Sequence, residues 1–94
     1  MKKVYFSIPV SVFKEDKTFV AYSPVLDLST CGKTLEKAQE MFQEATEIFF
    51  EELERKGTTG EVLTSLGWKK VNSSWFPPTE VSHSTQRFDL ALKC

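Results

Sequence analysis

Cysteine and histidine are scarce in this chain, and their scarcity excludes several kinds of site. The 94 residues include two cysteines, Cys31 and Cys94, and one histidine, His83. Because no Cys-x-x-Cys pair or Cys/His cluster is present, the sequence predicts no metal site. Cys31 lies in a strand that we expect to be buried, and Cys94 is the last residue of the sequence. We therefore expect no disulfide.

Long apolar runs are also missing. The first residues, MKKVYFSIPV, have a basic start, but their apolar run is short, alternates with other residues and contains Pro9. It lacks the continuous apolar segment of a secretory signal, and no run approaches the roughly 20 residues of a membrane span. We expect a cytoplasmic protein with reduced cysteines.

Groups of residues typical of active sites are absent as well. The sequence has no Gly-rich phosphate loop, its serines lack the flanking glycines of a nucleophile elbow, and His83 lies in a polar stretch without a fixed acid or nucleophile nearby. A two-metal nuclease needs several clustered carboxylates, whereas the expected strands offer only Asp27. We predict no enzymatic activity and no cofactor. A metal-dependent nuclease that uses Asp27 stands as a contrasting hypothesis.

Charge of either sign is in little excess over the whole chain, because 13 acidic residues face 12 basic ones. This balance argues against a protein that holds nucleic acid by bulk charge. Acidic residues are nevertheless concentrated in one stretch, at Glu36, Glu40, Glu44, Glu47, Glu51, Glu52 and Glu54. Such a face is either simply solvated or attracts a basic partner by electrostatic complementarity.

The same stretch carries the clearest structural pattern, a helix between Thr34 and Gly57. Thr34 suits the N-cap position and Gly57 suits the C-terminal cap. Apolar residues recur three or four apart, as in a helix that covers one side of a sheet. They are Leu35, Ala38, Met41, Phe42, Ala45, Ile48, Phe49 and Leu53. Phe50 lies ~120° from the centre of this stripe, so it packs beneath a C-terminal strand or is exposed at an interface.

Alternating apolar residues predict three strands before the helix, at residues 4–13, 18–22 and 25–31, with a polar turn at 14–17. Pro9 cannot donate a ladder hydrogen bond, so we expect the first strand at a sheet edge. Three antiparallel strands covered by one long helix make an α+β fold.

Shorter elements are expected after the helix. Thr58 and Glu61 match a capping box at the start of a short helix. The elements that follow are a strand at 68–71, a turn at 72–74, a return arm at Trp75-Phe76, a linker at 79–85 behind Pro77-Pro78 and a last strand at 86–93. The last strand either returns to its own sheet or pairs with another subunit.

Three segments combine turn residues and fixed spacings with hydrophobicity. They are Phe19-Val20-Ala21, the run from Pro24 to Gly32, and the helix start from Thr34 to Ala38. With the acidic helix and Leu66-Gly67-Trp68, they resemble the HicB-like antitoxin family. The resemblance implies a partial RNase H-like domain (β-β-β-α-β) at residues 1–71, without the catalytic apparatus. Residues 72–94 would be a hairpin, a linker and a terminal strand.

The resemblance also implies a function. HicB-like antitoxins bind and neutralise a small basic toxin, a HicA-type mRNA interferase, by protein–protein contact. Many members carry a C-terminal DNA-binding module, which nothing after Trp68 matches, so we expect no direct DNA binding. We expect a homo-oligomer, either a dimer or a tetramer. The alternative is an orphan oligomeric scaffold or small-ligand-binding domain without a toxin.

Six residues are candidate partner contacts, because aromatic residues are enriched at interface anchors and Asp27 stands alone beside a turn. They are Tyr22, Asp27, Phe50, Trp68, Trp75 and Phe76. Two alternatives stay open. The crowded aromatic residues Trp68, Trp75 and Phe76 would close the open end of a small core, and Asp27 would cap the backbone.

Overall fold

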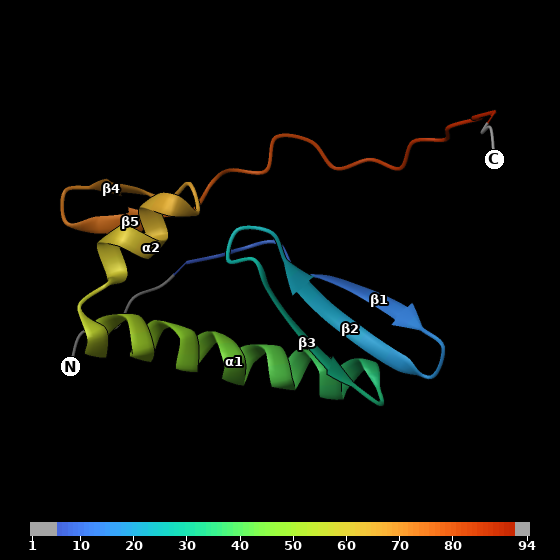
Figure 1. Ribbon diagram of the computed structural model, residues 1–94, viewed down its shortest axis with the longest axis horizontal. Helices are drawn as coiled ribbons and strands as arrows, with labels where there is room; N and C mark the ends of the chain where they lie inside the picture. Colours follow the sequence, from blue (N-terminus) through green and yellow to red (C-terminus); the bar gives the residue numbers. More distant parts are fainter. Residues whose placement is uncertain (1–5, 92–94) are drawn as a thin grey trace.

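The computed structural model describes residues 6–91 and arranges them as a sheet on one long helix, with a smaller helix and hairpin beside it (Figure 1). The elements are β1 (Ser11–Glu15), β2 (Thr18–Ser23), β3 (Leu28–Gly32), α1 (Leu35–Lys56), α2 (Thr59–Ser65), β4 (Lys69–Val71) and β5 (Ser74–Phe76). The antiparallel sheet has the order β1-β2-β3, and β4 pairs with β5 in a separate sheet. The predicted α+β fold is confirmed.

The first strand begins and ends later than predicted, although its place at a sheet edge is confirmed. Residues 6–10 have no regular secondary structure, and residues 1–5 lie outside the described part of the chain. Ser11 already pairs with Tyr22, one residue before β2 ends, so residues before Val10 have no partner strand. The strand assigned to residues 4–13 was therefore wrong over much of its length.

The turn after β1 is tighter than the predicted turn at residues 14–17. Glu15 pairs with Thr18, which leaves only two residues in the turn. Asp16 has a φ of 53°, the left-handed conformation that favoured two-residue hairpin turns require. Lys14 and Glu15 consequently belong to β1.

The third strand is shorter than predicted, because its first residues form a turn. Asp27 has a φ of 49°, which interrupts the extended backbone, so β3 starts at Leu28. Val25 and Leu26 are nevertheless buried, within the turn that precedes β3. Cys31, which we expected in a buried strand, is exposed instead.

The long helix begins and ends where its capping residues predict. The Thr34 hydroxyl accepts a hydrogen bond from the Lys37 N–H at 3.0 Å. Gly57 has a φ of 66°, and its N–H donates to the Glu54 carbonyl at 3.2 Å. These contacts satisfy backbone groups that a helix end otherwise leaves without partners.

The apolar stripe of α1 is only partly covered. Ala38, Phe42 and Leu53 are buried, whereas Leu35, Met41 and Ile48 are exposed. A sheet of three short strands is too narrow to cover a stripe of this width along a 22-residue helix. The expectation that the whole stripe faces the sheet was therefore wrong at these three residues.

Two buried clusters hold the elements together. Ala21, Ala38 and Phe42 lie between the sheet and the first half of α1. The second cluster joins the β2–β3 turn to the second half of α1 and to α2, and comprises Val25, Leu26, Leu53, Leu63 and Trp68. The Trp68 indole N–H donates to the Val25 carbonyl at 2.8 Å, which ties together residues 43 positions apart.

The elements after α1 agree only in part with those predicted from the sequence. The helix α2 and the hairpin β4–β5 are confirmed, and the hairpin spans the expected boundary between residues 71 and 72. The predicted capping box is not confirmed, because the Thr58 side chain makes no capping hydrogen bond. The ψ of Thr58 is 11°, which is not the extended value that an N-cap residue usually adopts. Residues 86–91 have no regular structure where we predicted a strand, and residues 92 and 93 are outside the described range.

Candidate functional site

A groove of about 790 Å³ lies between the second half of α1, α2 and the N-terminal segment. We call it the aromatic groove, because its floor contains Phe6, Phe50, Trp68 and Trp75. The apolar floor comes from four separate parts of the chain, so folding is needed to assemble it. Its volume is within the range of about 300–1,000 Å³ that is common for binding sites of small molecules.

Three of the four floor residues, Phe6, Phe50 and Trp68, are in direct ring contact with one another. The ring of Phe6 lies 5.1 Å from that of Phe50 and 5.5 Å from that of Trp68, measured between centroids. The rings of Phe50 and Trp68 are 6.0 Å apart. These separations are typical of aromatic pairs that attract one another through their edges and faces. The floor is therefore a firm apolar surface.

Phe50 owes this position to its place on α1, away from the stripe that faces the sheet. The sequence left two environments open for it, a C-terminal strand or an exposed interface. The structure gives a third, because Phe50 is half-buried between Phe6 and Trp68. The prediction that Phe50 packs beneath a C-terminal strand was therefore wrong.

An acidic rim runs along one side of the aromatic groove. Glu47, Glu51 and Glu54 all line it and are exposed, and their spacing of four and three residues places them on one side of α1. None of the three forms an ion pair with another residue of the described range 6–91. Their negative charge is thus available to a cation from outside.

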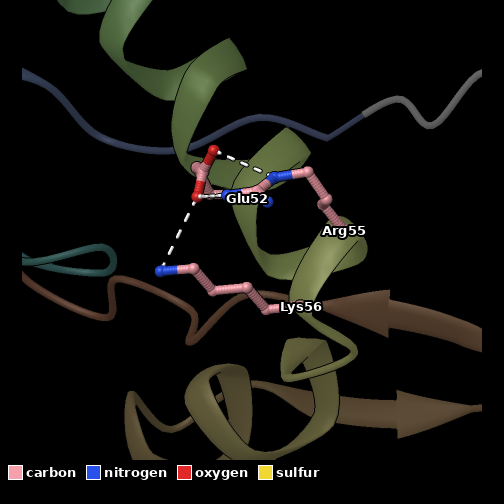
Figure 2. A network of polar contacts seen from close by, with 3 residues as sticks. All are labelled: Glu52, Arg55 and Lys56. Carbon is pink, nitrogen blue, oxygen red and sulfur yellow. Dashed lines mark hydrogen bonds and ion pairs between the residues drawn. The ribbon is translucent and has the colours of Figure 1, made fainter.

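The basic residues at the end of α1 do not neutralise this rim. Arg55 and Lys56 both contact Glu52, with nitrogen–oxygen distances of 2.7 Å and 3.7 Å (Figure 2). At about 100° per residue, Glu52 lies on a different side of the helix from the rim. These exposed pairs add little stability, but they direct the two cations away from the groove.

The groove brings together half of the predicted partner contacts. Phe50, Trp68 and Trp75 line it, although Trp68 is only 3% exposed and supports the floor from below. Phe76 lies elsewhere, in a second hollow that it shares with Pro77, Pro78 and residues 7–9. Trp68 also closes the second buried cluster, as one of the sequence interpretations had it.

Tyr22 and Asp27 form a separate pair at the β2–β3 turn. The Tyr22 hydroxyl donates to a carboxylate oxygen of Asp27 at 3.1 Å. This hydrogen bond, loss of water contact and the charge of Asp27 together raise the pKa of Tyr22 above its ordinary value of 10.0. Asp27 therefore has a structural partner, and neither residue lines the groove.

Sequence reasoning missed Phe6 and the rim as parts of one site. Phe6 was assigned to a strand, and its contact with α1 depends on how the chain approaches β1. The spacing of Glu47, Glu51 and Glu54 beside Phe50 is visible in the sequence and was a usable signal.

Within residues 6–91, no three His, Cys, Asp or Glu side chains lie close enough together to hold a metal ion. Neither of the helices described there has the length and apolar character needed to cross a membrane. Comparison of the chain with protein-family models, curated proteins and solved structures found no match.

Proposed function

We propose that this protein is an antitoxin-like inhibitor that binds a small basic HicA-type mRNA interferase. It acts in the cytoplasm by protein–protein contact and not as an enzyme. The sequence segments that resemble HicB-like antitoxins support the proposal. The observation that carries it is the aromatic groove, in which an apolar floor meets three carboxylates without ion-pair partners among residues 6–91.

The chemistry of the groove indicates how such a partner binds. The acidic rim draws a basic surface toward the groove and raises the association rate, an effect that falls as salt screens the charges. An apolar side chain flanked by Lys or Arg then packs on Phe50 and Trp75 and lowers the dissociation rate. A toxin that is held in this way is neutralised when its RNA-binding surface is covered.

The test is co-expression with any small basic protein encoded beside this one, followed by purification and an RNA-cleavage assay. We expect a stable complex that suppresses cleavage. Replacing Glu47, Glu51 and Glu54 together by Gln should weaken binding tenfold or more at low salt. The matched control replaces Glu36, Glu40 and Glu44, which changes the net charge equally but leaves the groove intact. Equal weakening by both triple variants would contradict a role for the groove.

A second candidate is an oligomeric scaffold or small-ligand-binding domain without a toxin, which the volume of the groove favours. A compound with an aromatic ring and an amine should then raise the melting temperature, and Trp75→Ala should abolish the effect. Absence of a neighbouring small basic protein would favour this candidate. The nuclease hypothesis predicts RNA cleavage that is lost in Asp27→Asn, and we expect no such cleavage.

A further inference from the structure

The C-terminal arm, residues 77–91, has the sequence of a strand but no strand beside it. Phe88 and Leu90 alternate with Arg87 and Asp89, a pattern typical of a strand that is buried on one face. In the described chain, however, these two apolar side chains are 72% and 74% exposed. The arm thus carries an apolar face that its own copy leaves uncovered.

The sheet has a matching surface at β1. This strand is at the edge of the sheet, so its backbone groups on one side pair with no other strand of residues 6–91. Phe13 pairs with Val20 on the face opposite α1, since their neighbours Val12 and Ala21 pack on the helix side. Phe13 is 56% exposed. An edge strand with an exposed aromatic residue is a template for an added strand.

The other edge of the sheet, formed by β3, offers less apolar surface to an added strand. On the face opposite α1, β3 presents Ser29 and Cys31, because they pair with Tyr22 and Val20. Neither side chain gives an apolar surface comparable with Phe13. We therefore consider β1 the acceptor edge.

The arm does not pair with the β1 edge of its own copy. Residues 76–80 share a hollow with Ser7, Ile8 and Pro9, which lead into β1, and from there the arm runs away from the sheet with no other element of residues 6–91 beside it (Figure 1). Phe88 and Leu90 thus stay exposed although the β1 edge of the same copy has no partner strand among residues 6–91.

We propose that two copies of this chain exchange their arms. Residues 86–91 of each copy pair with β1 of the other, and Phe88 and Leu90 cover Phe13 and Val20. Because each copy donates one arm and accepts one, the arrangement closes as a symmetric dimer and the β1 edge of each copy is covered. The dimer uses a surface separate from the aromatic groove, so it does not depend on toxin binding.

The first test is the mass of the full chain in solution by light scattering. We expect twice the chain mass of 10.7 kDa. The double variant Phe88→Asp/Leu90→Asp should have half the mass of the unaltered protein. The control Val81→Asp changes a residue of the same arm that is 94% exposed and lies outside the alternating pair, and it should stay dimeric. A chain that ends at Pro78 should be monomeric, with the circular dichroism of a folded domain.

The second test separates exchange from other modes of association. Phe13→Asp impairs the acceptor edge but keeps the arm, whereas the double variant keeps the edge but impairs the arm. Each should be monomeric alone, and their mixture should form a one-to-one heterodimer through the intact arm and the intact edge as concentration rises. A monomeric unaltered chain, a dimer that survives the double variant, or the absence of a heterodimer would each overturn the exchange.

Discussion

The two halves of α1 pack in opposite ways, and the difference explains where a site is available. In the first half, small residues bring the backbones together, since Ala38 is buried against Ala21 and the backbone of Gly32 lies against the helix. In the second half, large aromatic residues hold the neighbouring segments farther away, and the aromatic groove remains between them. Close packing gives rigidity, whereas packing through bulky rings leaves a surface that a partner can use.

The largest expected effect on stability is in the closely packed first half of α1. A Cβ at position 32 would lie 2.7 Å from the Ala38 nitrogen and 2.9 Å from the Lys37 carbonyl carbon, both of them backbone atoms that cannot move alone. Gly32→Ala should therefore lower the free energy of unfolding by about 3 kcal/mol, measured by urea denaturation. Gly60→Ala is the control, because its new Cβ meets only Trp75 at 3.8 Å. That change should raise stability by about 0.5 kcal/mol.

The next largest effect on stability is expected at the second half of α1, where the aromatic residues pack. Trp68→Phe removes the indole N–H that donates to the Val25 carbonyl and leaves this buried acceptor without its partner. The free energy of unfolding should fall by about 2 kcal/mol. Trp75→Phe serves as the control, since Trp75 is only half-buried and should lose less than about 1 kcal/mol. Equal losses would show that ring volume, and not the hydrogen bond, accounts for the role of Trp68.

A smaller effect of opposite sign is expected at Ser23, the last residue of β2. The Ser23 hydroxyl is fully buried and has no hydrogen-bond partner among the described residues. Ser23→Ala removes this unpaired group and should raise the free energy of unfolding by about 1 kcal/mol. Thr30→Val is the contrasting variant, because the Thr30 hydroxyl does donate, to the Ala38 carbonyl at 3.1 Å. A loss of stability in both variants would contradict this account.

The last prediction concerns pH. The pKa of Tyr22 is raised in the folded protein, so the stability from its neutral form is complete below a pH of about 10 and is lost as the pH rises through the folded-state pKa. Asp27→Asn keeps a residue that tolerates positive φ but removes the charge, and it should lower the pKa of Tyr22. The measurement is tyrosinate absorbance at 295 nm in a Tyr5→Phe background. An unchanged midpoint would show that Asp27 is not the cause.

The sequence predicted the parts whose stabilising contacts are local. The ends of α1 follow from Thr34 and Gly57, whose hydrogen bonds reach only three residues along the chain. The hairpin β4–β5 follows from a turn at Asn72 and Ser73, which both adopt positive φ. These elements were correct because a few neighbouring residues are sufficient to form them.

The candidate site was only partly predictable, because its residues meet across long separations in the chain. Phe50 and Trp75 were identified as candidates from their residue type, but their common groove depends on Phe6, which reaches α1 only in the folded chain. The starts of β1 and β3 were misjudged for a similar reason. Alternation shows that a segment can be a strand, whereas the strand next to it decides where pairing begins.

By itself, the sequence determined the α+β class, the length and caps of α1 and the acidic character of one helix face, since these depend on periodicity and short-range hydrogen bonds. The tertiary structure decided which apolar residues are covered. It exposed Cys31 and Ile48, placed Phe50 in a groove and left Phe88 and Leu90 without a partner strand. Burial depends on what distant segments lie against a residue, and no local pattern contains that information.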